Sequence, residues 1–76
     1  MEMIRKTVTY GVDGLMEWRV VLPAGATSVR VAFTGGTVTG YGVAPATFRT
    51  SDPILQRIIE QSGYFRRGRI YICRRG

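Results

Sequence analysis

The chain has 76 residues, of which 45% are hydrophobic and 21% charged, values typical of one folded domain and not of a disordered tail. It has no histidine and one cysteine, which excludes an intrachain disulfide, a CxxC zinc site and histidine-based catalysis. The formal net charge is +6, a basic excess that an acidic partner would complement.

The same sequence predicts a single domain spanning residues 1–76, with a thin core. No apolar run approaches the roughly 18 residues that a membrane span needs. Glu2, Arg5 and Lys6 precede no apolar segment, so we expect no signal peptide at the N-terminus. A domain this small often needs a staple, and here we expect self-association or docking on a larger body to supply it.

Alternation of apolar and polar residues dominates the first fifty positions and predicts strands. The first strand holds Ile4, Val8 and Tyr10, and the tract 11–14, with two glycines and an aspartate, is typical of a turn. The second strand is expected to share one apolar face, formed by Met16, Trp18, Val20 and Leu22. Because of these neighbours, Trp18 is predicted to be a core residue.

The tract 23–25, Pro-Ala-Gly, is a second turn signal, and a third strand follows with Val29, Val31 and Phe33 on one face. The pair Gly35–Gly36 predicts a two-residue hairpin into a fourth strand, Thr37–Val43. Gly40 and Gly42 within that strand indicate a bulge, a bend or a close backbone approach. A short fifth strand is predicted over Ala46–Arg49.

One helix is predicted after these strands. Asp52 is suited to the N-cap and Pro53 to the first helical position, while Gly63 is expected to end the helix as its C-cap. Its apolar stripe, which we expect to lie on the sheet, consists of Ile54, Leu55, Ile58 and Ile59. A helix of about ten residues is too short to be stable alone in water, so it must pack.

A last strand, Arg69–Arg74, follows the helix. Its alternation places Ile70 and Ile72 on one face, with Arg69, Tyr71 and Cys73 on the other. The predicted fold class is therefore mainly β (α+β), with one short helix before the last strand. The five to six strands form either a small antiparallel sheet or a partly open barrel.

The C-terminal segment carries the charge asymmetry, because five of the eleven basic residues are arginines among the last eleven positions. The candidate interaction residues are Arg66, Arg67, Arg69, Tyr71, Arg74 and Arg75. Three interpretations stay open: an edge strand blunted by charge, an arginine-rich protein interface, and a nucleic-acid groove with interleaved aromatic rings. The absence of lysine from this segment favours forked contacts with carboxylates or phosphates.

Features that resemble catalytic motifs have plainer explanations. Cys73 has no histidine to activate it, so we interpret it as a strand residue. The glycine-rich tracts 34–37 and 40–42 open no helix and lack the phosphate-loop lysine, so a turn and a bulge explain them better. We therefore predict that the protein is not an enzyme, with no catalytic residues, cofactor, metal site or small-molecule substrate.

A family resemblance covers most of the chain after Glu17. The residues that carry it are Ala46 to Gln56, Ile59 to Ser62, Tyr64 and Phe65, and Gly68 to Ile70, with Trp18 to Pro23 and Val29 to Gly36 compatible. In this pattern the chain resembles small virion-associated structural proteins of tailed phages and prophages of gut bacteria. The resemblance implies a non-enzymatic part of a particle and brings no active site with it.

The expected function is that of an auxiliary capsid or head-associated subunit. It would assemble with identical copies or a larger coat or head protein, through sheet edges and the arginine-rich end. Its expected location is the virion, assembled in the host cytoplasm, with no membrane partner. The alternative is a small basic β-barrel that binds single-stranded nucleic acid.

Overall fold

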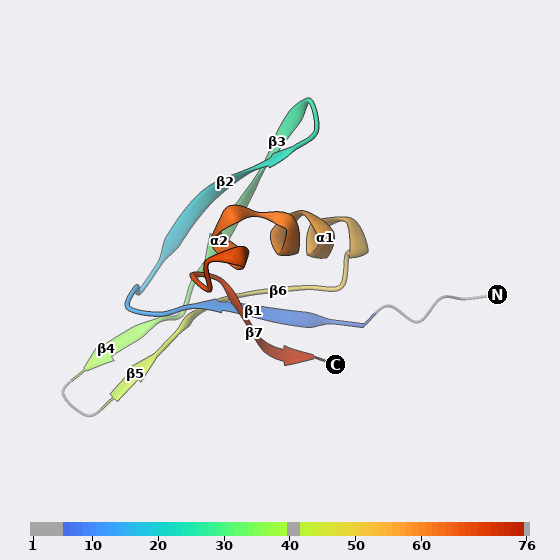
Figure 1. Cartoon of the computed structure of the whole chain (residues 1–76). Coiled ribbons are helices and arrows are strands. Elements are labelled where there is room, and N and C mark those ends of the chain that lie inside the picture. The colour runs from blue at the N-terminus through green and yellow to red at the C-terminus, as the bar shows by residue number, and fades with distance from the viewer. Residues whose placement is uncertain (1–5, 40–41, 76) are drawn as a thin grey trace.

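The computed structural model describes residues 6–39 and 42–75, which form short strands and two short helices (Figure 1). In chain order the elements are β1 (Val8–Val12), β2 (Trp18–Ala24), β3 (Thr27–Phe33), β4 (Thr37–Thr39), β5 (Gly42–Ala44), β6 (Ala46–Thr50), α1 (Pro53–Gln61), α2 (Gly63–Arg66) and β7 (Tyr71–Arg75). The prediction of a mainly β, antiparallel fold with a short helix before the last strand is confirmed. The predicted architecture was either an antiparallel sheet or a partly open barrel. The described strands form antiparallel sheets.

The central sheet has three antiparallel strands in the order β6–β1–β7. Tyr10 of β1 pairs with Phe48 of β6 and Ile72 of β7, so these side chains share one face. Gly11 was predicted to begin a turn but lies inside β1, and the chain leaves the strand only at Asp13. Ile4, predicted for the same strand, lies outside the described residues.

The β2–β3 hairpin forms a separate two-stranded sheet, which rises beyond the helices in Figure 1. Val20 and Leu22 of β2 and Val31 of β3 are buried on its inner face. The predicted turn at 23–25 is shorter than expected, because Pro23 stays in β2 opposite Ser28. The turn itself begins at Gly25, whose φ of 65° is available to glycine at no steric cost.

The tract around Gly35 and Gly36 does not form the predicted two-residue hairpin. Instead, Thr34, directly after β3, forms an antiparallel bridge with Thr47 of β6: the two amides each donate to the other residue's carbonyl, at 3.0 and 2.8 Å. Gly36 packs against backbone, since an added Cβ would overlap the Leu15 carbonyl oxygen. Gly36 is needed for the close approach of the Leu15 backbone, but in the sequence the Gly35–Gly36 pair is typical of a turn.

The predicted fourth strand, Thr37–Val43, is divided into β4 and β5, which pair with each other as a small hairpin. The prediction of one bulged strand is wrong, because the glycine-rich tract separates two strands. Thr37 pairs with Ala44 and Thr39 with Gly42. Gly40 lies outside the described residues.

Helix α1 begins as predicted but ends one residue earlier than expected. Asp52 is the N-cap, and its carboxylate accepts a hydrogen bond from the Ile54 amide at 2.9 Å. The C-cap is Ser62, in extended backbone, and Gly63 begins α2. The Ser62 hydroxyl donates to the Ile59 carbonyl at 2.6 Å and accepts from the Phe65 amide at 3.3 Å, so one residue joins the two helices.

The core lies between the inner faces of both sheets and α1. Its buried hydrophobic residues are Val8, Tyr10, Val12, Val20, Leu22, Val31, Phe33, Ala46, Ile59 and Ile70. Two expectations fail at its edges. Met16 precedes β2 and is 68% exposed, and Ile54 of the helical stripe is equally exposed, so only Ile59 of α1 is fully buried. Trp18 is half-buried against this core.

Candidate interaction surfaces

The six predicted interaction residues do not form one site. Arg66, Arg67 and Arg69 lie at or just beyond the end of α2, whereas Tyr71 lies at the start of β7. Arg74 and Arg75 occupy the other end of that strand. All five arginines are exposed, and the segment distributes them over three parts of the molecule.

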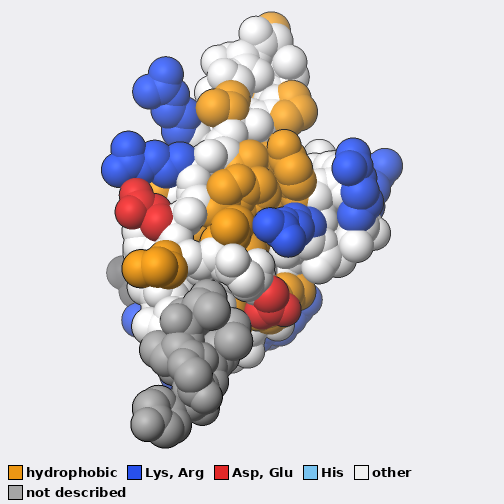
Figure 2. All heavy atoms as spheres, turned by 90° about the vertical axis from the view of Figure 1, so that its left-hand side faces the viewer, with side chains coloured by type: hydrophobic (Ala, Val, Ile, Leu, Met, Phe, Trp, Pro, Cys, Tyr) orange, Lys and Arg blue, Asp and Glu red, His pale blue; other side chains and the backbone are white. Residues whose placement is uncertain are grey.

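The first part is a group of side chains that we call the aromatic–arginine surface: Trp18, Tyr64, Arg67 and Arg69. The Tyr64 and Trp18 rings meet edge-on, with centroids 5.1 Å apart. The Arg69 guanidinium carbon lies 5.9 Å from the centroid of the Trp18 ring, in cation–π geometry. Figure 2 shows the face of the molecule that is on the left in Figure 1, where hydrophobic side chains gather in a patch with basic side chains on both sides.

Backbone hydrogen bonds of the turn after α2 fix this arrangement. The Arg69 and Ile70 amides both donate to the Tyr64 carbonyl, at 2.8 and 3.2 Å. Gly68 makes the turn with a φ of 79°, a conformation that favours glycine. From the other direction, Trp18 begins β2 and rests on buried Phe33, with ring centroids 5.6 Å apart. A shallow hollow lies beside them, lined by Tyr64, Arg67, Gly68 and Arg69.

The described carboxylates are all engaged away from the C-terminal arginines. Asp13 accepts from the Tyr71 hydroxyl, Glu17 pairs with Arg19, Asp52 caps α1 and Glu60 accepts from the Tyr10 hydroxyl. Within residues 6–39 and 42–75 the one ion pair is Glu17–Arg19, at 3.2 Å. The arginines of this segment therefore have no carboxylate partner in the described part of the chain.

The second part is the face of the β6–β1–β7 sheet opposite Tyr10, which we call the open sheet face. Thr9 pairs with Arg49 on one side and with Arg74 on the other, so these three residues form a row across the face. A bulge after Ile72 makes this possible, because it aligns Arg74 with Thr9. Arg49 was not among the predicted residues; period-two alternation in 46–50, combined with the pairing of β6 and β1, identifies it.

Tyr71 lies in the next row of the open sheet face, opposite Gly11. Its hydroxyl donates to the Asp13 carboxylate at 2.6 Å, and this bond raises the Tyr71 pKa well above its ordinary value. Cys73 is exposed and also lies against Gly11. The predicted last strand began at Arg69, but β7 begins at Tyr71, and Arg69 lies against Trp18 instead of on this face. The rest of the predicted alternation is confirmed, with Tyr71 and Cys73 on this face and Ile70 and Ile72 toward the core.

Arg75 belongs to neither surface. It pairs with Val8, and its positive charge acts on Tyr10 on the core side of the sheet. The Tyr10 hydroxyl donates to Glu60 of α1 at 2.5 Å. Burial, together with this bond, raises the Tyr10 pKa far above its ordinary value, while Arg75 opposes the shift. The Tyr10–Glu60 hydrogen bond ties β1 to α1.

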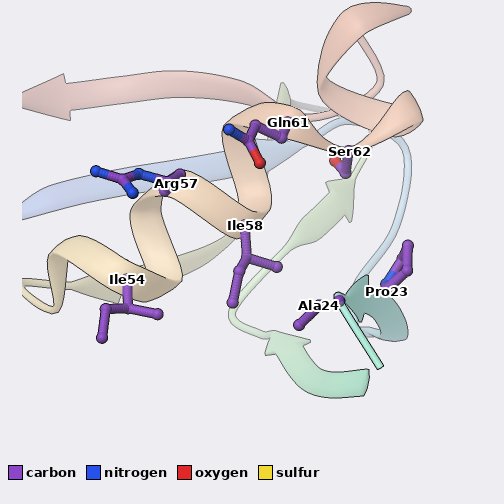
Figure 3. Close-up of a pocket in the computed structure, with 8 residues that line it drawn as sticks. Pro23, Ala24, Ile54, Arg57, Ile58, Gln61 and Ser62 are labelled. Atoms are coloured by element: carbon purple, nitrogen blue, oxygen red, sulfur yellow. The ribbon is translucent and has the colours of Figure 1, made fainter. Parts of the chain in front are cut away.

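A second hollow, of about 400 Å³, lies between the tip of the β2–β3 hairpin and α1 (Figure 3). Ile54 and Ile58 point from the helix toward the hairpin residues Pro23 and Ala24, while Arg57 lies to the side. This explains why Ile54 is exposed although it is on the apolar stripe of α1. No sequence signal indicates this hollow, because the hairpin tip and the helix meet only in the fold.

Two further properties of the described residues concern metals and membranes. Residues 6–39 and 42–75 contain no group of three or more cysteine, aspartate or glutamate side chains placed to hold a metal ion. In the same part of the chain, neither helix is long and apolar enough to cross a bilayer.

Comparison of the chain with protein-family models, with curated proteins and with solved structures found no match.

Proposed function

We propose that this protein is a non-enzymatic structural subunit that docks on a protein neighbour through its aromatic–arginine surface. The neighbour is an identical copy or a larger coat or head protein, and the assembly is a phage particle. The resemblance to virion-associated proteins supports the particle. The observation that carries the docking surface is the contact of Arg69 and Tyr64 with the half-buried Trp18 ring.

The composition of this surface supports a protein partner. Tryptophan, tyrosine and arginine are the residues most enriched among those that dominate binding energy at protein interfaces. The Trp18 ring already has Phe33, Tyr64 and Arg69 as neighbours, so it is held in place before any partner arrives. A surface organised in advance loses less conformational entropy on binding.

The electrostatics of the surface support an acidic docking partner. Arg67 and Arg69 are exposed and have no carboxylate partner among the described residues. A guanidinium presents a rigid fork that matches a carboxylate with two parallel hydrogen bonds. Aspartate or glutamate side chains of the neighbour would complete these contacts, while its apolar residues would cover Tyr64.

The proposal is tested by incorporation into particles. Particles are produced with the wild-type chain or with the variant R69E, and the purified particles are analysed for this chain by mass spectrometry. The same measurement is made for R66E/R69E, since Arg66 is the exposed last residue of α2 and one of the candidate interaction residues. We expect both variants to be lost from particles while circular dichroism and melting remain those of the wild type.

The matched control is R30E, which reverses an exposed charge on β3, away from the surface. We expect R30E to enter particles normally. Normal incorporation of R66E/R69E would show that the aromatic–arginine surface is not the docking site. Absence of the wild-type chain from every purified particle would exclude the structural role itself.

A further inference from the structure

The open sheet face is free of the helices, both of which lie on the other side of the β6–β1–β7 sheet (Figure 1). Arg49, Cys73 and Arg74 on this face are exposed, and Thr9 and Tyr71 are partly exposed. The face therefore presents side chains from three strands on a shallow, polar surface. It is separate from the aromatic–arginine surface, which is built by β2 and α2.

The two arginines of this face flank the central strand. Both pair with Thr9, one from β6 and one from β7. Adjacent strands lie about 4.8 Å apart, so the Cα atoms of Arg49 and Arg74 are separated by roughly 10 Å. Neither arginine forms an ion pair within the described residues. Two cations at this spacing present a positive row across the sheet.

Tyr71 forms an aromatic platform beside that row. The ring carbon Cζ lies 3.3 Å from the position that a Cβ at Gly11 would take, so the ring rests directly on the backbone of β1. Its hydroxyl is held by Asp13 at the end of the strand. Contact at the ring and a hydrogen bond at its tip fix the tyrosine in one orientation. Any larger residue at position 11 would lift the ring off the sheet.

From this geometry we propose that the open sheet face binds single-stranded nucleic acid. The phosphates lie on Arg49 and Arg74, and one base stacks on Tyr71. Binders of single strands combine a positive groove with aromatic rings that accept any base. The formal net charge of +6 makes the approach of a polyanion favourable. This proposal is independent of the docking role of the aromatic–arginine surface.

The platform favours single strands over two other polyanions. A duplex keeps its bases stacked on each other, so it offers phosphates to the arginines but no base to Tyr71. An acidic peptide would bring its carboxylates close to Asp13, whose own charge lies at the tip of the tyrosine. A nucleobase, in contrast, places an uncharged ring against the platform.

The experiment measures binding of a fluorescein-labelled oligothymidine of about 12 nucleotides by anisotropy, over a series of salt concentrations. We expect salt-sensitive binding by the wild type. In R49A/R74A we expect the slope of log K against log salt to fall by about 1.4, about 0.7 for each phosphate contact. The matched control R30A/R57A removes two exposed arginines from β3 and α1 and should leave the slope unchanged.

Tyrosine variants separate stacking from charge. Tyr71→Ala should weaken binding roughly 5- to 100-fold without changing the salt slope, because a base loses its stacking partner. Tyr71→Phe keeps the ring and loses only the hydroxyl bond to Asp13, so it should bind within a few-fold of the wild type. If Tyr71→Ala melts at a markedly lower temperature, ultraviolet crosslinking of a thiouridine oligonucleotide to wild-type Tyr71 decides the point.

Four outcomes would overturn the proposal. They are no binding at low salt, equal effects of R49A/R74A and R30A/R57A, crosslinks that miss Tyr71, and equal competition by polyglutamate and by unlabelled oligothymidine. The last outcome would show that the face binds acidic chains of any kind. Preference for duplex over single strand would likewise exclude a role for the platform.

Discussion

The aromatic–arginine surface and the open sheet face combine the same residue types but differ in how their aromatic ring is supported. Trp18 rests on buried Phe33, so its ring is an extension of the core. Tyr71 rests on a glycine backbone on the side of the sheet away from the core. With the proposed binding roles, Trp18 contributes to both binding and fold stability, whereas Tyr71 contributes mainly to binding. The predictions below test this difference, from the largest expected effect to the smallest.

Removal of each ring should destabilise the fold to different extents. Trp18→Ala should lower the free energy of unfolding by about 3 kcal/mol, because the half-buried ring supports Phe33 and Tyr64. Tyr71→Ala should cost about 1 kcal/mol, the value of a cross-strand contact. Urea unfolding followed by circular dichroism measures both. Equal losses in the two variants would contradict the distinction between the surfaces.

Gly11 should be the most sensitive position of the open sheet face. Gly11→Ala places a Cβ against the Cys73 sulfur and the Tyr71 ring, so we expect about 2 kcal/mol of destabilisation from overpacking. Cys73→Ala alone should be nearly neutral, because Cys73 is exposed. The double variant should recover part of the loss, as measured by a double-mutant cycle of urea unfolding. Strict additivity would show that the two side chains do not compete for this space.

Alkaline pH should weaken both tyrosine contacts. The folded-state pKa of Tyr10 and of Tyr71 is raised above the ordinary value of 10.0, so the folded protein retains protons that the unfolded chain releases. Stability from these groups is complete below pH 10 and falls as the pH rises above it. Urea unfolding at pH 8 and pH 11 should show a smaller fall in Tyr10→Phe than in the wild type.

Tyr71→Phe should reduce the same alkaline fall by less than Tyr10→Phe does. Its hydroxyl bond to Asp13 is at the surface, where solvent screens the interaction, whereas Tyr10 is buried. The ordering of the two variants therefore measures how far each tyrosine belongs to the core. An identical pH dependence in the wild type and both variants would refute the assignment.

The smallest effect is expected at the Glu17–Arg19 pair beside β2. Both side chains are largely exposed, so Glu17→Gln should change the free energy of unfolding by less than about 0.5 kcal/mol. The variant removes the carboxylate of the residue directly before Trp18 and leaves the aromatic–arginine surface and the open sheet face unchanged. A comparison of the melting temperatures of Glu17→Gln and Trp18→Ala would measure how much charge and packing each contribute to stability at the start of β2. A loss above about 1 kcal/mol would show that the pair is structural.

Local signals predicted the parts of this fold that depend on a few adjacent residues. Asp52 and Pro53 start α1 as expected, because capping and a fixed φ act within one turn. Glycine was less informative. Gly36 is required by the Leu15 backbone and Gly11 by the Cys73 and Tyr71 side chains, and none of these neighbours is adjacent in sequence. Glycine marks close approach as readily as it marks a turn, so these two positions were misassigned.

The interaction surfaces were harder to predict, because strand pairing decides them. The tail arginines were evident from the sequence, but their division among three places depends on the bulge in β7 and the turn at Gly68. Arg49 joins Arg74 only because β1 lies between their strands. Trp18 meets Arg69 because the turn at Gly68 directs the chain after α2 toward the start of β2. Composition identified the charge, and topology determined where it is presented.

Ser62 has a consequence for the sequences that this fold can tolerate. Its hydroxyl donates to the last turn of α1 and accepts from α2, so one atom serves two helix ends. Aspartate could accept but not donate, and alanine could do neither. Threonine is the natural substitute, and even it must place a branched side chain in a buried space. In evolution, position 62 should therefore vary far less than the exposed arginines that follow it.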